Sequence, residues 1–381
     1  MNATLQCLSQ ILPLAYYFKT NPQINYTIMK YDNNNEQCLT ESFKLSIDNL
    51  WPEYYNHHRK NNNNYFYEPL DFKNKISIMN PVFHGIKAYD VKDLLNFIII
   101  TLHNELNMGQ KINSGKINSD NQINQNFMFN YFMDTFFKEN KSIIRDIFFG
   151  VSHIMIRCSY CMSTKYNYDA YFSLNFPLEE VRKYKIQELT NTNNNIMNQM
   201  NMNQNMFINM NNQMDIYNNN LNKIQLLNQN NIDIFDCFDY NQKIYYDFMG
   251  QNQLYCDRCR ETAPFAYIKC LYNCPEVLIL VLDRELDFQS KIKFKFDFQL
   301  NLLNYIEDKA SGCLYELICV INKLGESGMS SHFIANCKSP NDAMWYQYND
   351  EFVTPVTNFN QQIFDLGMAY ILFYKKMKMN N

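Results

Sequence analysis

Apolar residues follow a helical spacing near the start of the chain. Leu5, Leu8, Leu12 and Ala15 recur at intervals of three or four residues, which predicts a helix with one buried stripe running to about Pro13. Residues 88–106 repeat this spacing, with apolar side chains along one side at Val91, Leu94, Leu95, Ile98 and Leu102. The early part of the chain is therefore predicted to be helical.

Strand patterns dominate the last third of the chain. Residues 277–282 are apolar at every position, as expected for a central strand that is covered on both faces. Residues 291–300 alternate apolar and polar side chains, which predicts one half-buried strand. Residues 315–321 and 369–374 add two more strands. Helices followed by an antiparallel sheet indicate the α+β class.

A tract rich in Asn, Met and Gln occupies residues 188–231. It has almost no charge and no sustained period, so we predict that it is disordered, because it offers too little apolar surface to offset the entropy of ordering. A loose helix built on its Met residues is the alternative.

Length and charge narrow the function classes. The chain has 381 residues, is 46% hydrophobic and carries a net charge of −4, which suits one large catalytic domain or two ordinary ones. No dense basic run is present, so we expect no nucleic-acid partner. The sequence has neither a signal-peptide pattern nor an apolar run of about 18 residues, so we expect no membrane contact and an intracellular location, in the cytoplasm or nucleus.

Four of the twelve cysteines form two Cys-x-x-Cys pairs, Cys158 with Cys161 and Cys256 with Cys259. Two such pairs in a long chain without a signal peptide predict a structural Zn²⁺ held by four thiolates. The remaining eight lack ligand spacing and are interpreted as small buried apolar residues. These eight are Cys7, Cys38, Cys237, Cys270, Cys274, Cys313, Cys319 and Cys337.

A histidine and an asparagine flank a turn-prone segment, residues 338–342. A hairpin turn centred on Pro340 and Asn341 would make His332 and Asn349 cross-strand neighbours. Asn349 would then accept a hydrogen bond from Nδ1 of His332 and leave Nε2 for a thiol. A slip of one residue would bring Asp350 to the same place, so Asp350 is the alternative orienting group.

These segments together resemble the ubiquitin-specific proteases, a papain-like family of cysteine deubiquitinases. Residues 1–8 (MNATLQCL) resemble the end of the family's Cys box, and residues 328–335 with 345–350 resemble its His box. In this alignment the nucleophilic cysteine falls two residues upstream of Met1. Residues 88–106 resemble a further family helix, with Asp90 and Asp93 at its two acidic positions.

The resemblance implies one papain-like protease domain over residues 1–381. Its parts would be thumb helices at 1–107, zinc-ribbon-like fingers at 145–180 and 232–275, the insertion at 188–231 and an antiparallel palm at 276–376. It also implies a monomer whose partners are ubiquitin and ubiquitinated proteins, with Asp90 and Asp93 holding the basic ubiquitin tail.

The function implied by the resemblance is thiol-dependent hydrolysis after the terminal Gly-Gly of ubiquitin. We expect the chain as written to be inactive, because the nucleophile is missing and Cys7 lies about 12 Å too far along the helix to replace it. An N-terminally truncated gene model of an active enzyme is the favoured interpretation. A catalytically inactive ubiquitin-binding module and an unrelated zinc-stabilised scaffold are the alternatives.

Overall fold

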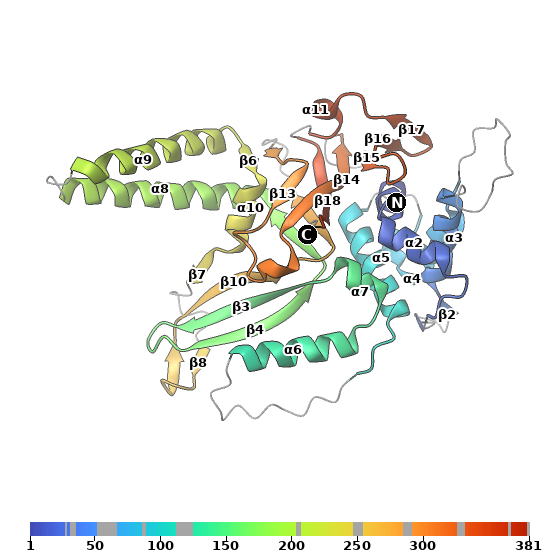
Figure 1. The fold of residues 1–381 in the computed structure, drawn as a ribbon, viewed down its shortest axis with the longest axis horizontal. Helices are drawn as coiled ribbons and strands as arrows, with labels where there is room; N and C mark the ends of the chain where they lie inside the picture. The colour runs from blue at the N-terminus through green and yellow to red at the C-terminus, as the bar shows by residue number, and fades with distance from the viewer. Residues whose placement is uncertain are drawn as a thin grey trace.

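The computed structural model describes residues 1–26, 29–30, 36–51, 67–85, 89–111, 125–202, 207–246, 254–284, 292–325, 332–364 and 367–378. Helices gather on one side of a large sheet, a second sheet extends away from it, and a pair of long helices projects from the opposite side (Figure 1). The predicted α+β class is confirmed.

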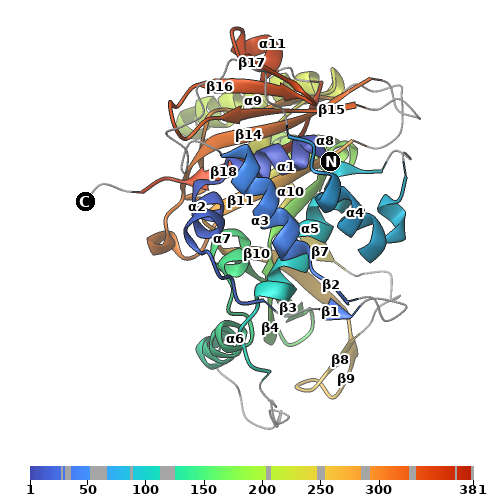
Figure 2. The ribbon, with the colours of Figure 1, turned by 90° about the vertical axis from the view of Figure 1, so that its right-hand side faces the viewer.

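Most N-terminal residues form helices that cover one face of the large sheet (Figure 2). These helices are α1 (Asn2–Ser9), α2 (Leu12–Thr20), α3 (Leu39–Leu50), α4 (Leu70–Met79), α5 (Val91–Leu106) and α7 (Ile143–Phe148), with a 3₁₀ turn at Pro81–Phe83. A small hairpin joins β1 (Met29–Lys30) to β2 (Glu36–Gln37). None of the helices in the described ranges has the length and hydropathy that crossing a membrane requires.

The first predicted helix is two helices. α1 ends at Ser9 and α2 begins at Leu12, which places Pro13 in the first turn of α2. Proline is tolerated there because its missing N–H has no helical partner to lose. The break also changes the helical phase, so Leu12 is 46% exposed although Leu5, Leu8 and Ala15 are buried as predicted.

The large sheet has the strand order β17-β16-β15-β14-β18-β11-β5, with β13 also paired to β14. Neighbouring strands are antiparallel except β5 and β11, which run parallel. The strands are β5 (Ser173–Pro177), β11 (Val277–Asp283), β13 (Gln299–Asn301), β14 (Leu314–Leu324), β15 (His332–Lys338), β16 (Trp345–Asn349), β17 (Phe352–Pro355) and β18 (Ala369–Lys376). The strands predicted at 315–321 and 369–374 are confirmed as parts of β14 and β18.

β11 divides the core in two. Val277, Ile279 and Val281 pack with the N-terminal helices, whereas Leu278, Leu280 and Leu282 pack with a second cluster on the other face. That second cluster includes residues of α10 (Ile234–Asn241) and the paired short strands β6 (Asn231–Asp233) and β12 (Lys293–Lys295). The prediction of a central strand covered on both faces is confirmed.

Residues 292–301 do not form the single strand predicted over 291–300. Lys291 lies outside the described residues; β12 pairs with β6, and β13 pairs with β14. Ile292, Phe294, Phe296 and Leu300 are nevertheless buried, so the alternation correctly predicted the buried side. The alternating pattern specifies which side is buried but carries no information on how many partner strands share it.

The second sheet has the order β4-β3-β10-β7, and its neighbours are antiparallel. Its strands are β3 (Gly150–Cys158), β4 (Thr164–Tyr171), β7 (Ile244–Tyr246) and β10 (Phe265–Asn273), and the hairpin of β8 (Leu254–Cys256) with β9 (Glu261–Ala263) lies at its tip. Helix α6 (Gln125–Glu139) packs on β4 through Phe129 and Phe132, whose rings contact Tyr168. Two short pieces complete the fold, α11 (Phe359–Gln362) and a 3₁₀ turn at Lys309–Ser311.

In the described part of residues 188–231 the favoured prediction of disorder is wrong, and the helical alternative is what the structure has. It forms most of two antiparallel helices, α8 (Leu178–Met202) and α9 (Phe207–Asn228), which project side by side from the body (Figure 1). Asn193 is buried between them, where its amide donates to the Tyr217 carbonyl and its Oδ1 accepts from Asn220. The two helices supply each other with the partners that each lacks alone.

Candidate active site and metal centre

His332 and Asn349 meet where β15 begins and β16 ends. His332 Nε2 lies 2.6 Å from Asn349 Oδ1, and the His332 side chain is 44% exposed. Because the amide oxygen can only accept, Nε2 carries the proton in this contact and Nδ1 keeps its lone pair. The predicted pair is thus adjacent, although the ring nitrogen in contact is Nε2 where the sequence analysis expected Nδ1.

The hairpin register differs from the prediction by two residues. Ala335 pairs with Tyr348 and Lys338 with Trp345, so the loop runs through residues 339–344, with Ala343 at a φ of 59°. His332 and Asn349 are therefore diagonal neighbours and not directly opposite. A shift of two residues leaves both side chains on the same face of the hairpin, which is why the contact survives.

Asp350, the alternative orienting residue, lies next to this pair. Its Oδ2 is 3.9 Å from His332 Nε2, and its Oδ1 accepts a hydrogen bond of 2.7 Å from the Asn2 amide in the first turn of α1. Asp350 has a φ of 52° at the turn after β16, a conformation that Asp tolerates better than most residues. Asp350 thus connects the histidine to the start of α1, a link that the sequence did not reveal.

Helix α1 packs against β14 and β15, so its first turn lies beside the start of the His332 strand. A cavity of about 520 Å³ opens next to Asp350. Its walls include Met1 and Asn2 of the first turn, Leu70 and Lys73 of α4, and Tyr348 and Glu351. Asp350, which contacts both His332 and Asn2, therefore lies at the edge of a cavity that the first turn of α1 also lines.

Asp90 and Asp93 lie at the start of α5. Asp90 caps the helix by accepting from the Lys92 N–H at 2.8 Å, and the Tyr370 hydroxyl donates to its other oxygen at 2.6 Å. Asp93 is exposed in the first turn. Lys92 pairs with Asp283 of β11 at 3.3 Å, and Tyr370 belongs to β18, so the N-terminal end of α5 contacts both strands. Sequence reasoning missed Tyr370, because nothing in residues 369–374 marks one aromatic residue as a partner of Asp90.

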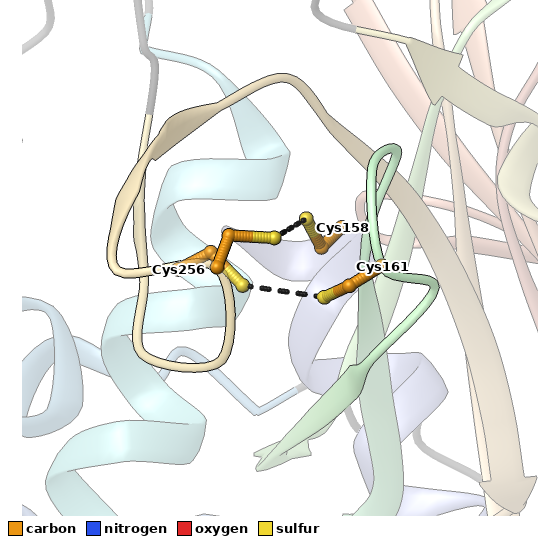
Figure 3. A group of neighbouring side chains, drawn as sticks. Cys158, Cys161 and Cys256 are labelled. Carbon is orange, nitrogen blue, oxygen red and sulfur yellow. Dashed lines mark hydrogen bonds between the residues drawn. The ribbon is translucent and has the colours of Figure 1, made fainter.

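The four predicted metal ligands lie together at the tip of the second sheet. Figure 3 shows Cys158 at the end of β3 and Cys161 in the turn after it, facing Cys256 at the end of β8. Cys158 Sγ is 3.9 Å from Cys259 Sγ, Cys161 Sγ is 3.5 Å from Cys256 Sγ, and all four sulfurs lie within 4.8 Å of one another. A tetrahedral zinc with bonds of about 2.3 Å would hold its sulfurs about 3.8 Å apart, so the arrangement fits this ion.

The two cysteine turns have the same backbone geometry. The N–H of Met162 donates to the Cys158 carbonyl and that of Arg260 to the Cys256 carbonyl, and both donor residues have φ near 60° (59° and 60°). The backbone N–H of Cys259 and the Ser163 hydroxyl lower the pKa of Cys256 to about 6, whereas the contact with the Cys161 thiol and burial raise the pKa of Cys259. The two shifts oppose each other, so the fit to a metal ion depends on the positions of the four sulfurs.

The eight other cysteines are mostly buried, as expected. Seven are buried and Cys270 is half-buried. Three of the seven, Cys7, Cys319 and Cys337, converge in the core, although they come from distant parts of the chain. No spacing rule applies to residues brought together by tertiary packing, so the sequence analysis did not find this group.

Comparison with known families agrees with this geometry. The family model described as ubiquitin carboxyl-terminal hydrolase matches residues 1–374. The chain belongs to the ubiquitin carboxyl-terminal hydrolase family. The resemblance to ubiquitin-specific proteases drawn from the catalytic boxes is therefore confirmed.

Relatives within the hydrolase family are distant in sequence. Ubiquitin carboxyl-terminal hydrolase Usp2 of Drosophila melanogaster is 21% identical over 382 residues, which cover 99% of this chain and 34% of that protein. Ubiquitin carboxyl-terminal hydrolase 2 of Homo sapiens is 23% identical over 386 residues, which cover 98% of this chain and 53% of that protein. The chain thus spans between a third and about half of these relatives' length.

Solved structures share the hydrolase fold. The SAGA Ubp8/Sgf11/Sus1/Sgf73 DUB module bound to ubiquitin aldehyde contains a chain that aligns with a TM-score of 0.60 at 17% identity, covering 100% of this chain and 68% of that chain. The same module bound to monoubiquitin gives a TM-score of 0.60, also at 17% identity, and the alignment covers 100% of this chain and 67% of that one. The papain-like α+β fold expected from the sequence is therefore confirmed.

Proposed function

We propose that the chain is most of the catalytic domain of a cysteine-type deubiquitinase, which hydrolyses the bond after the terminal Gly-Gly of ubiquitin. The observation that carries this proposal is the 2.6 Å contact of His332 with Asn349 beside the first turn of α1. The distant relatives, which are ubiquitin carboxyl-terminal hydrolases of Drosophila melanogaster and Homo sapiens, support the proposal. We further propose that it acts as a monomer inside the cell.

The proposed chemistry needs a thiol placed ahead of α1. His332 would remove the thiol proton through the ring nitrogen that does not contact Asn349, and the helix N-terminus would stabilise the thiolate. The thiolate sulfur attacks the carbonyl carbon of the last ubiquitin glycine, and protonated His332 returns the proton to the leaving amine. Water then hydrolyses the thioester, with the histidine again accepting a proton.

A ubiquitin-based probe that traps active thiols tests this proposal. We expect no covalent labelling of the 381-residue chain, because the polar contacts of His332 in the described residues are with Asn349 and Asp350 and involve no cysteine. We expect labelling when the family segment Gly-Asn-Thr-Cys-Tyr is placed before Met1, and loss of labelling in the same chain carrying His332→Ala. Labelling of the unextended chain would contradict the assignment of the thiol.

A ubiquitin-binding module without catalysis is the second candidate. The observation in its favour is that Cys7, the cysteine of α1, is fully buried and lies against Cys337 instead of His332.

Calorimetric titration of the zinc-loaded chain with ubiquitin distinguishes a ubiquitin-binding module from an unrelated scaffold, for which no heat of binding is expected. We expect Asp93→Asn to weaken binding at low salt, because a charge-assisted contact with the basic tail is lost. Asp134→Asn on the distant helix α6 is the matched control.

We also propose that Cys158, Cys161, Cys256 and Cys259 hold one structural Zn²⁺. Four sulfurs, two from each of two hairpins, converge at distances that suit a tetrahedral ion, and this supports the proposal. Elemental analysis should find one zinc per chain in the wild type and in Cys270→Ser, and less than half of that in Cys259→Ser. Equal zinc content in both variants would refute the site.

A further inference from the structure

Three cysteines outside the proposed zinc centre meet in the main core. Cys7 lies on α1, Cys319 on β14 and Cys337 on β15, and the last two are directly opposite each other in the β14–β15 register. Cys7 Sγ is 3.7 Å from Cys337 Sγ, and the three sulfurs all lie within 4.8 Å of one another. The three thiols therefore form one compact triangle between a helix and two strands.

The surroundings of this triangle are apolar and closed. All three cysteines are 0% exposed, and they belong to or border the cluster of aliphatic and aromatic side chains between the helices and the sheet. Their polar contacts in the described residues are with one another and a long 3.8 Å contact of the Cys319 thiol to the Cys7 carbonyl. Among the same residues, no histidine, carboxylate or fourth cysteine joins the group.

Packing of small apolar residues explains each cysteine separately, but it does not require three sulfurs to point at one another. A three-coordinate ion with metal–sulfur bonds of about 2.3 Å would hold its sulfurs about 4 Å apart, close to the 3.7 Å contact. Zn²⁺ prefers four ligands, whereas thiolates select soft ions such as Cu(I). Three sulfur ligands therefore favour a soft ion of low coordination number, such as Cu(I).

We propose that Cys7, Cys319 and Cys337 form a three-coordinate Cu(I) site. Each thiol that becomes a ligand releases its proton to solvent, so the uptake of copper is accompanied by proton release and needs no oxidant. The ion would connect α1 to β14 and β15, and β15 begins with His332. Copper would thus fix the helix relative to the histidine strand, independently of whether the chain hydrolyses ubiquitin.

Competition with a chromophoric Cu(I) chelator under anaerobic conditions tests the site in the zinc-loaded chain. We expect the wild type to take up one more Cu(I) than Cys319→Ala, and to gain several degrees in Tm on uptake. Cys237→Ala removes a fully buried cysteine of α10 that lies outside the triangle, so it should bind copper as the wild type does. Copper that displaces zinc from the four-cysteine centre would appear equally in all three proteins.

Equal copper uptake by the wild type and Cys319→Ala would overturn the proposal. X-ray absorption at the copper edge of the loaded wild type gives a second test that does not depend on the folding of a variant. Three sulfur neighbours in addition to any copper at the four-cysteine centre are expected. A copper coordinated by two sulfurs, or by nitrogen and oxygen, would equally rule the site out.

Discussion

The contact between His332 and Asn349 was predicted correctly although the predicted register of the hairpin was wrong by two residues. A register wrong by one residue would not have predicted it. Side chains alternate between faces with a period of two, so a shift of two keeps both residues on one side and only makes the pair diagonal. Asp350, one residue further along, is held by its left-handed φ and by the Asn2 amide at the outer edge of the pair. Both orienting candidates face the same ring nitrogen, Nε2 of His332, and Asn349 is the nearer, at 2.6 Å against 3.9 Å for Asp350.

Replacing Asn349 with Ala should lower kcat about 100-fold or more, with little change in KM, in the chain extended by the Cys box. The ring of His332 would lose the acceptor that fixes its tautomer, and proton transfer contributes roughly that factor. Steady-state kinetics on a fluorogenic ubiquitin substrate measures the effect. Asp350→Asn, which keeps a side-chain acceptor for Asn2, should lose much less. A larger loss in Asp350→Asn than in Asn349→Ala would reverse the assignment.

Glu105 is a buried carboxylate with a structural role. Its oxygens accept from the backbone N–H groups of Leu39 and Thr40 and from the Thr40 hydroxyl, at 2.7–2.8 Å. The last turn of α5 thereby caps the first turn of α3, where unpaired N–H groups favour an anion. Neither helix signals this partnership in its own sequence.

Glu105→Ala should lower the free energy of unfolding by about 3 kcal/mol, because two buried N–H groups lose their charged acceptor. Urea unfolding followed by circular dichroism measures the loss. Glu105→Gln, which keeps one acceptor oxygen, should fall between the wild type and the alanine variant. Glu351→Ala on the exposed turn is the control, and a similar loss there would mean that the capping contact contributes little.

Among the elements, the helical pair α8 and α9 departs most from the sequence-based expectation. Its polar tract is ordered by contacts between the two helices and by ion pairs at their base. Lys185 contacts Asp239, and Lys223 contacts Asp233 and Asp236 of the α10 capping segment. The outer part of the pair projects beyond the core (Figure 1).

Replacing residues 190–221 with a short Gly-Ser linker should change Tm by no more than a few degrees. The deletion removes the projecting part but keeps Lys185 and Lys223, together with the base contacts that belong to the second core cluster. Thermal unfolding and the helical signal in circular dichroism measure the outcome. The matched variant Lys223→Ala, with the pair intact, should cost more stability than the deletion. Loss of cooperative unfolding on deletion would show that the pair is part of the core.

At the scale of the whole molecule, two buried histidines make the stability of the protein depend on pH. His103 on α5 is buried against Ser142 and Asn140, at 2.8 and 3.1 Å. Burial lowers its pKa below the usual 6.5, although the contact with Asn140 opposes the shift. His153 on β3 is also buried, and its pKa is lowered for the same main reason, with Glu307 opposing.

Stability should therefore fall as the pH drops below about 6.5. The unfolded chain takes up protons on these histidines before the folded chain does, so acid favours unfolding, whereas above this pH the contribution is fully present. Urea unfolding of His103→Gln between pH 7 and 5 should show a weaker pH dependence than the wild type. His84→Gln, at an exposed site, should follow the wild-type curve. Parallel curves for all three proteins would remove His103 as the cause.

The sequence by itself determined the features that depend on local pattern. The helical stripe of α5, the buried run of β11 and the two Cys-x-x-Cys pairs each lie within a short segment, and each appears as predicted. The His box also specified the contact of His332 with Asn349, because residue alternation fixes the face of a strand without knowledge of the loop.

Tertiary structure decided what depends on partners distant in sequence. Helices α8 and α9 are ordered because each packs against the other. Residues 292–301 form two short strands because they have two different partners: β12 pairs with β6, and β13 pairs with β14. The capping of α3 by Glu105 and the triangle of Cys7, Cys319 and Cys337 likewise join segments that share no sequence period. Local periodicity specifies which side of an element is buried, whereas the identity of its neighbours arises only when the chain is packed.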